Sequence, residues 1–494
     1  MSIKKEFIQD YTDDIVIDYF GGFCPAWFEN SYPYYGNKNH ASDMENVDIT
    51  DPNVLTQGPG IADLTAGTQE GAVTTLIRQI LPYVVASNST YAIGGAKLYQ
   101  LSSTAVTNAG IWPHTINKAV VTGEDGESVI YHNGKIYYFY NHSGDAGDIG
   151  TYDLATTFDD DWGSTTPTGA EALEDAPHQA IKGGEDGLYF ANGRYIGYIN
   201  PDGDVLETQA LDFWADSEVA SLAWNNNRII AAVNRPNISG SSFNQSAIYN
   251  WDTVAASWEG DPVEVQGKIG ALYTKNGITF VWWQDSSDSG GYNFGYITGG
   301  QLETLRRYKG SLPLFYQVCE FKGFLAWVSG NKVYMWGAKD VDVPVSLFQY
   351  CEGKQGTVGG IATPFGELLI ASYTDTDFSL AKPSGYTKDS SYKTMAFRVS
   401  GPWHKFQILT IFVETEQLAE GAKVDFTLTY DKGKSTQSLN QIAYSTANTT
   451  RHKILNKSFE VEDFRLDISW ANGSTTNPVK IRSIYITGKA VKYN

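Results

Sequence analysis

Pairs of hydrophobic, aromatic-rich runs separated by a tight turn recur seven times between residues 90 and 375. The turns fall at Gly95, Gly134, Gly193, Asn227, Gly277, Gly323 and Gly366. The separations are 39, 59, 34, 50, 46 and 43 residues, and their mean of roughly 45 is the length that a four-stranded propeller blade needs. Because a blade exposes apolar faces that only neighbouring blades can cover, the pattern predicts an all-β protein with a closed β-propeller of about seven blades.

The apolar runs themselves have the character of strands. Ile136 to Tyr140 and Thr279 to Trp283 are almost continuously apolar, which is typical of strands buried on both faces. His-Asn-Gly and Lys-Asn-Gly stand directly before the second run of two copies, and Asn-Gly in that place indicates a tight hairpin. The polar segments between runs are then loops.

Differences in composition and in repeat content divide the chain into three segments. Residues 1–62 are acidic and aromatic with no repeat, 63–390 carry the repeats, and 391–494 contain period-two alternation such as Thr-Leu-Thr-Tyr and Asp-Ile-Ser-Trp. The last segment predicts an antiparallel β-sandwich with one wet face per sheet. Its expected strands are 406–414, 423–430, 464–470 and 480–487.

The first segment predicts an extended N-terminal arm. Two alternatives stay open: the arm packs on its own propeller, or it reaches a neighbouring subunit. Its large aromatic side chains are the candidate partner-binding residues, because rings of this kind dominate protein interfaces. They are Phe20, Phe23, Trp27, Tyr34 and Tyr35.

The charge balance narrows the possible partners. With 56 acidic and 36 basic residues the net charge is −20, so sequence-specific nucleic-acid binding by a basic face is not expected. No run approaches the length of a membrane span, and no apolar stretch follows Lys4 and Lys5 as in a signal peptide. Synthesis in a cytoplasm is expected. Cys319 and Cys351 lie in successive repeats and could form a disulfide.

Searches for catalytic and cofactor-binding chemistry return no constellation. The phosphate-loop, G-x-S-x-G and H-E-x-x-H patterns are absent, and the seven His are scattered. A propeller hydrolase needs paired carboxylates near its channel, whereas the expected inner strands read Ser-Leu-Ala-Trp and Gly-Ala-Leu-Tyr. We therefore predict no enzyme activity, no catalytic residues and no cofactor.

Two weaker signals concern ligands. Acidic loops at 145–148, 159–161 and 202–204 could supply oxygen ligands to calcium, although acidic turns without a metal are commoner. Trp162, Trp214, Trp251 and Trp258 stand in or beside loops, where rings either bind sugars or proteins or fill gaps between blades.

Segments at both ends of the chain resemble virion proteins of tailed bacteriophages. The first runs from Ala41 to Pro52, followed by Gly58-Pro59-Gly60, and is similar to the segment that leads into the first blade of virion propeller proteins. Near the other end, Gly401 to Phe406, Val413 to Glu416, Gly421 and Tyr430 to Gly433 resemble a sandwich of minor tail proteins. The resemblance implies a tail hub, nozzle or adaptor component that forms ring oligomers without enzyme activity.

Together these observations predict a structural protein of the virion tail, made in the host cytoplasm. Its expected partners are other virion proteins, further copies of itself and, as an additional option, a host-surface glycan. The alternative is a carbohydrate-binding or glycoside-hydrolysing β-propeller, which would need a funnel lined by acidic and aromatic side chains.

Overall fold

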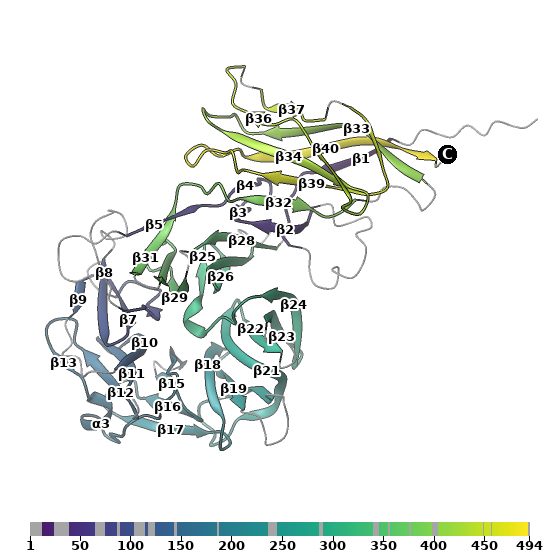
Figure 1. Cartoon of the computed structure of the whole chain (residues 1–494). Helices are drawn as coiled ribbons and strands as arrows, with labels where there is room; N and C mark the ends of the chain where they lie inside the picture. Colours follow the sequence, from purple (N-terminus) through teal and green to yellow (C-terminus); the bar gives the residue numbers. More distant parts are fainter. Residues whose placement is uncertain are drawn as a thin grey trace, which may run out of the picture. The chain divides into compact units, whose positions relative to one another are not determined.

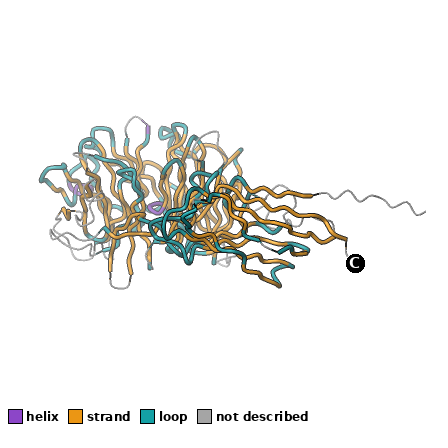
Figure 2. The backbone as a smooth tube through the Cα atoms, turned by 90° about the horizontal axis from the view of Figure 1, so that it is seen from above, coloured by secondary structure: helices purple, strands orange, loops and turns teal. Residues whose placement is uncertain are grey.

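The structure is a computed structural model of the whole chain. It describes residues 12–23, 39–64, 75–85, 89–102, 114–116, 124–142, 146–184, 187–235, 245–285, 290–338, 345–353, 356–374, 377–397, 404–447, 449–455 and 457–492. In these ranges the chain is almost entirely strand and loop (Figure 2). The exceptions are the short helix α3 (Trp162–Thr165) and the 3-10 turn η2 (Phe315–Gln317). No helix in these ranges is long and apolar enough to cross a membrane.

The repeats form a β-propeller, as the sequence predicts, with seven four-stranded blades in the described ranges; five are separate sheets, and two belong to one seven-stranded sheet. In chain order the first three are β6 (Gln79–Ile80), β7 (Ser89–Gly94), β8 (Lys97–Ser102) and β9 (His114–Ile116); β10 (Asp125–His132), β11 (Lys135–Asn141), β12 (Gly147–Tyr152) and β13 (Phe158–Asp159); and β14 (Ala180–Lys182), β15 (Leu188–Asn192), β16 (Tyr195–Ile199) and β17 (Leu206–Asp212).

The fourth and fifth sheets share one long strand, β21. They are β18 (Glu218–Asn225), β19 (Arg228–Arg235), β20 (Gln245–Trp251) and β21 (Glu259–Lys275), then β21, β22 (Ile278–Asp285), β23 (Gly291–Thr298) and β24 (Gln301–Lys309). The last two are β25 (Val318–Phe321), β26 (Phe324–Ser329), β27 (Lys332–Gly337) and β28 (Ser346–Glu352), and β29 (Thr357–Ala362), β30 (Leu369–Thr374), β31 (Asp377–Ser384) and β5 (Gly60–Asp63).

Five of the seven turns read from the sequence join the first two strands of a blade, whereas those at Gly95 and Gly193 join the second and third strands. All seven turn residues have positive φ, from 51° at Gly95 to 83° at Gly323, with 60° at Asn227. This left-handed conformation is open to Gly and tolerated by Asn, which explains why those residues mark the repeat. The first strands gather around a central axis (Figure 1).

The ring is closed by a strand from the start of the chain. β5 pairs with β31 as the outermost strand of the last blade, and the amide of Leu64 donates to the carbonyl of Leu380 at 2.9 Å. The side chains of Leu64 and Leu380 share a buried cluster with Ile77 and Tyr99. First and last blade are therefore joined by side-chain packing, and the amide of Gly360 in the last blade donates to the carbonyl of Ile77 at 2.9 Å.

The C-terminal region folds as a two-sheet antiparallel sandwich. One sheet has the order β1 (Thr12–Ile17), β40 (Ile481–Lys492), β33 (His404–Thr415) and β37 (Arg451–Lys453), with β38 (Phe459–Val461) also on β33. The other has the order β2 (Ala41–Glu45), β32 (Ser391–Thr394), β39 (Phe464–Ser469), β34 (Lys423–Tyr430) and β35 (Ser435–Ser438), with β36 (Ile442–Ala443) on β34. A separate hairpin joins β3 (Val47–Asp48) to β4 (Thr56–Gln57).

The contacts between residues divide the chain differently from the three segments read from its composition and repeats. One compact unit, the propeller unit, consists of 62–332 and 353–382, and the other, the sandwich unit, of 1–61, 333–352 and 383–494. Most of the described part of 1–62 is thus built into the sandwich unit: β1 pairs with β40 over Thr12–Ile17, and β2 pairs with β32. The exception is β5, which belongs to the last propeller blade. Alternating Ile15 and Ile17 lie opposite buried Ile486 and Ile484, so β1 has a core-facing side like any sandwich strand.

The cysteines do not form the disulfide that their spacing allowed. Cys319 and Cys351 are both free and buried. Burial raises the pKa of both thiols, so they stay protonated and behave as small apolar groups.

Candidate functional site

The innermost strands of the propeller enclose a cavity of about 300 Å³. Seven segments line it, one from each blade. They are 79–83, 129–130, 179–181, 222–224, 272–274, 315–319 without Gln317, and 361–362. The side chains in this lining are apolar or neutral amides, hydroxyls and a thiol, with no Asp, Glu, His, Lys or Arg among them.

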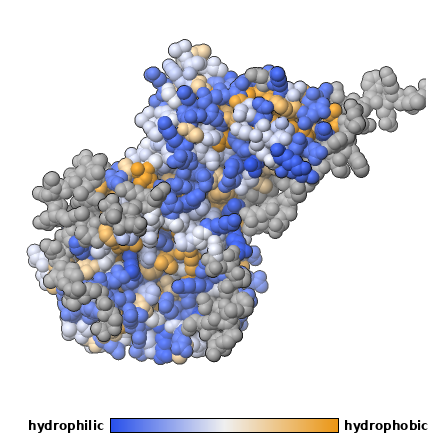
Figure 3. Space-filling model, viewed as in Figure 1, coloured by the Kyte–Doolittle hydropathy of each residue, from blue (hydrophilic) through white to orange (hydrophobic). Residues whose placement is uncertain are grey.

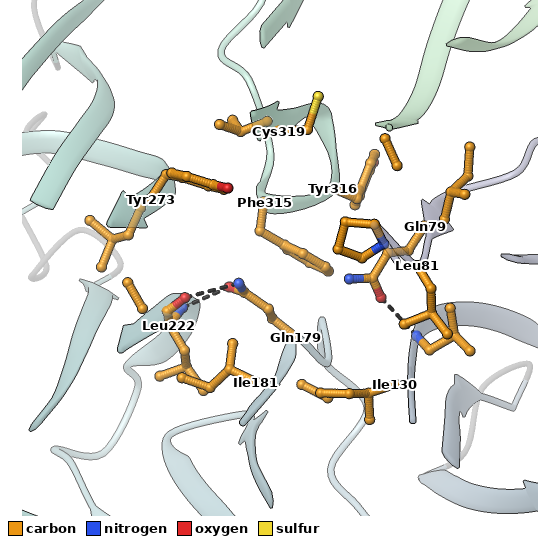
Figure 4. A pocket seen from close by; sticks show the side chains of 18 of the residues that line it. Gln79, Leu81, Ile130, Gln179, Ile181, Leu222, Tyr273, Phe315, Tyr316 and Cys319 are labelled. Carbon is orange, nitrogen blue, oxygen red and sulfur yellow. Dashed lines mark hydrogen bonds between the residues drawn. The ribbon is translucent and has the colours of Figure 1, made fainter. Parts of the chain in front are cut away.

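The amides that face the cavity are bound to neighbouring blades (Figure 4). The side chain of Gln79 accepts the backbone amide of Val129 in the next blade at 2.7 Å. The side chain of Gln179 makes two bonds to Leu222: it accepts the amide at 2.6 Å and donates to the carbonyl at 2.9 Å. We call these side-chain-to-backbone bridges amide clips.

Two further contacts repeat the arrangement around the ring. Gln317 in η2 donates to the carbonyl of Val358 at 2.6 Å, and the hydroxyl of Ser221 accepts the amide of Leu272 at 2.9 Å. Polar groups near the axis thus satisfy inner-strand backbone groups that would otherwise be buried without partners. Chemically, the channel can hold the blades in register and can enclose a small apolar group.

Carboxylates do occur at the start of β10, but one guanidinium binds both of them. Arg78 forms ion pairs with Asp125 and with Glu127. Glu127 is 6% exposed, and burial raises the pKa of its carboxyl group while Arg78 opposes that rise. The pair ties the first blade to the second, because Arg78 precedes β6 strand residue Gln79 and both acids lie on β10.

A buried histidine lies between the second and third blades. The ring of His178 is fully buried, with Nδ1 at 2.9 Å from the carbonyl oxygen of Ala191 and Nε2 at 3.0 Å from Oδ1 of Asn141. Burial lowers the pKa of His178 to about 4. The imidazole is therefore neutral at pH 7 and carries a single N–H, which donates to one of these two oxygens.

The predicted partner-binding aromatics are only partly within the described residues. Phe20 and Phe23 are buried in the sandwich unit, and the ring of Phe20 packs edge-on against Tyr392 at 5.9 Å. These two rings face inward. Their apolar area is already buried within their own chain, so it is not exposed to a partner. Trp27, Tyr34 and Tyr35 lie outside the described residues.

Asp145 lies outside the described residues, and the acidic loops at 159–161 and 202–204 are used locally. Asp160 accepts the hydroxyl of Tyr138 at 2.7 Å, Asp159 that of Thr166 at 2.7 Å, and Asp204 the amide of Asn200 at 2.7 Å. Within the described ranges, no group of three or more potential metal ligands comes together.

The four loop tryptophans separate into two kinds. Trp162 and Trp251 are buried, and the Trp162 ring meets Tyr137 at 5.2 Å in a blade core. Trp214 is 46% exposed, and its ring meets half-buried Trp258 at 5.6 Å. Some of these tryptophans therefore fill blade cores and others are exposed at the surface. Their position in or beside a loop did not predict which of the two applies.

The sequence analysis missed a row of apolar side chains on the outer side of the first sandwich sheet. Val16 lies opposite Tyr485, which lies opposite Phe412, and all three are half-buried. The guanidinium of exposed Arg451 lies 4.8 Å from the ring centre of Phe412 and 5.7 Å from that of Tyr485. We call these four residues the sandwich face.

The sandwich face has its own structural basis. Alternation along β33 turns Ile411 and Val413 into the core and so turns Phe412 outward. Figure 3 shows that hydrophobic areas interrupt the hydrophilic surface on the side of the molecule that it draws. The signal was present in the run Phe-Gln-Ile-Leu-Thr-Ile-Phe-Val-Glu, where an aromatic residue occupies a position that alternation assigns to solvent.

Similarity of this chain to known proteins is found at the level of solved structures. No protein-family model matches it, and neither does any curated protein. Among solved structures, an exo-β-1,3-galactanase from Phanerochaete chrysosporium with galactose is 10% identical, with a TM-score of 0.32 over 87% of this chain and 100% of that chain. A variant of that galactanase with β-1,3-galactotriose gives the same values. The AfRom2 CNH domain is also 10% identical, with a TM-score of 0.41 over 66% of this chain and 100% of that chain. Similarities at this level assign no activity.

Proposed function

We propose that the chain is a structural protein of a virion tail, in the role of a hub, nozzle or adaptor, that works by assembling with other chains and without catalysis. The observation that carries this proposal is the sandwich face. An outward sheet face that combines an aliphatic residue, two rings and an arginine has the composition of an interface centre.

The position of the sandwich face supports assembly in a second way. Val16 belongs to β1, which is an edge strand of its sheet. Edge strands present unpaired backbone groups next to such a patch, and other chains commonly add to them. Copies of this chain and other virion proteins are the partners we propose.

The propeller contributes rigidity to this role. Its amide clips bind Val129 and Leu222 across blade boundaries, and β5 closes the ring. A closed sheet ring has no long free edges. The resemblance of both chain ends to tail proteins supports the same context.

The test is a pair of substitutions that make the sandwich face polar. In Val16→Ser with Phe412→Ser, the loss of half-exposed apolar area leaves the fold intact and removes the interface centre. We expect the wild-type chain to form a discrete oligomer in mass photometry. The double variant should have the mass of a monomer in the same measurement and should remain folded.

Gln407→Ala is the matched control, because Gln407 is half-buried on the same strand, β33, but outside the row. A wild-type chain that stays monomeric, or a double variant that assembles as well as the control, contradicts the proposal. Deleting residues 1–60 would be a poorer test, since it also removes β1 and β2 from the two sandwich sheets.

A further inference from the structure

A groove of about 690 Å³ opens between the third and fourth blades of the propeller unit. Aromatic side chains from β15, β16, β18 and β20 line it, together with the loop that follows β20. These side chains are Tyr189, Tyr198, Trp224 and Trp251. Its volume lies in the range of sites that hold small organic molecules. We propose that this groove binds a neutral pyranose saccharide.

The rings form a platform with two accessible members. Tyr189 and Trp251 are buried and meet edge-on at 5.9 Å, so they serve as the base. Trp224 and Tyr198 are half-buried. Trp224 lies nearly parallel to Tyr189, at 17° and 6.5 Å between ring centres, and Tyr198 is tilted by 40° at 5.0 Å. Flat rings side by side suit the C–H face of a sugar, as aromatic rings do for other apolar faces.

Glycine keeps backbone close to these rings. A Cβ atom on Gly184 would come within 3.0 Å of the Trp224 ring, and one on Gly187 within 2.7 Å of the Tyr198 ring. A larger residue at either position would displace a ring. The orientation of the platform is therefore fixed before any ligand arrives, which lowers the entropic cost of binding.

The opposite wall is a loop held in a strained conformation. Thr253 has φ of 70°, an uncommon and costly conformation for a β-branched residue. Oδ1 of Asp252 accepts the amides of Val254 and Ala255 at 2.9 and 2.8 Å. The indole of Trp251 donates to the carbonyl of Ala255 at 2.7 Å. Strain of this kind persists only where surrounding contacts enforce it, and it concentrates at binding sites.

Polar groups at the groove suit hydroxyl groups of a ligand. The exposed carboxylate of Glu207 lies on the residue opposite Tyr198 in the sheet. Within the described residues, Glu207 and Oδ2 of Asp252 make no hydrogen bond, and both are ready acceptors. Asn227, exposed at the turn after Trp224, adds an amide.

The charge of the groove selects among ligand classes. Two carboxylates and a chain net charge of −20 disfavour acidic sugars and phosphates. A quaternary ammonium ligand would need several ring faces converging on one point, whereas here the two accessible rings flank the buried Tyr189. A neutral sugar uses both the flat rings and the carboxylates.

The experiment uses the full-length chain and two substitutions. Saturation-transfer NMR with maltose, cellobiose and lactose identifies the bound sugar, and calorimetric titration then measures its affinity. We expect binding of at least one of the three by the wild-type chain, and binding about tenfold weaker in Trp224→Ala and in Glu207→Ala. Glu207→Ala changes an exposed side chain, so it remains informative if Trp224→Ala does not fold.

Two variants serve as controls outside the groove: Trp214→Ala removes an exposed ring, and Glu264→Ala an exposed carboxylate. Both should bind the sugar like wild type. The proposal is overturned by no binding of any of the three sugars, by unchanged affinity in both groove variants, or by a preference for choline or sialic acid over the neutral sugars. Oligomer formation is measured separately, so failure here leaves the proposed assembly role untouched.

Discussion

Buried Glu127 and half-buried Arg78 form an ion pair at the boundary of the first two blades, with Asp125 as an outer member. A buried carboxylate is tolerable only while its counter-charge is present. The net stabilisation that the ion pair provides is therefore smaller than the free energy of unfolding that is lost when one partner is removed.

Replacing Arg78 tests this directly. Arg78→Met should lower the free energy of unfolding by about 3 kcal/mol at pH 7, because Glu127 is left charged and unpaired. Urea denaturation measures the loss. Adding Glu127→Gln should recover a substantial part of it, and the loss in the single variant should narrow toward pH 5 as Glu127 takes up a proton. An equal loss at both pH values would contradict this assignment.

His178 makes the fold sensitive to acid. Its pKa is lowered to about 4, so below pH 6.5 the unfolded chain binds a proton that the folded chain does not. The free energy of unfolding should fall between pH 6.5 and 4 by at most about 3 kcal/mol from this residue. In His178→Gln the fall over this interval should be smaller, as measured by urea denaturation at each pH. Parallel curves for the two proteins would assign the acid sensitivity elsewhere.

At the scale of elements, the sequence analysis was most successful where the local backbone decides the outcome. The turns at Gly134 and Gly277 have positive φ, and the Asn-Gly pair at each of them indicates such a turn directly in the sequence. The strands 423–430 and β34 agree at both ends. Long-range strand pairing leaves no such local signal in the sequence. For that reason the residues of β1 and β2 were predicted to belong to an extended arm that packs on its own propeller or on a neighbouring subunit.

In the central cavity, too, local features were visible in the sequence and long-range contacts were not. Apolar inner strands were visible in Ser-Leu-Ala-Trp, but the clip from Gln179 to Leu222 joins residues 43 positions apart. Nothing in the neighbourhood of Gln179 indicates its partner. The groove beside Trp224 likewise depends on two blades meeting, with rings drawn from four strands.

Loss of a single clip should loosen one blade boundary. Gln179→Ala leaves the amide and carbonyl of Leu222 without their side-chain partner, so we expect a loss of about 2 kcal/mol in the free energy of unfolding. Hydrogen exchange should rise at Leu222 first. The exposed Gln301→Ala is the control, with a change of less than about 0.5 kcal/mol. A Gln179→Ala variant as stable as this control would show that the clip contributes nothing.

At the scale of the whole molecule, the two compact units each have a core of their own. Leu64 is buried in the propeller unit, where it helps to close the ring, and Leu466 is buried in the sandwich unit. Their truncation should therefore affect different parts of the molecule.

Calorimetry of two variants tests this division. Leu64→Ala and Leu466→Ala should each cost about 2–5 kcal/mol by removing buried methyl groups. We expect two thermal transitions in the wild-type chain, with each variant lowering a different one. A single transition that both variants lower equally would show that the units unfold together.

The strand that closes the ring has a consequence for synthesis. β5 leaves the ribosome before any blade, and its partner β31 follows only after more than 310 further residues (Gly60–Asp63 and Asp377–Ser384). At usual translation speeds the early strand waits roughly 15 to 60 seconds for that partner. Until then the last blade is incomplete and the ring has an open gap, and a chaperone or a protease has its best access during this interval.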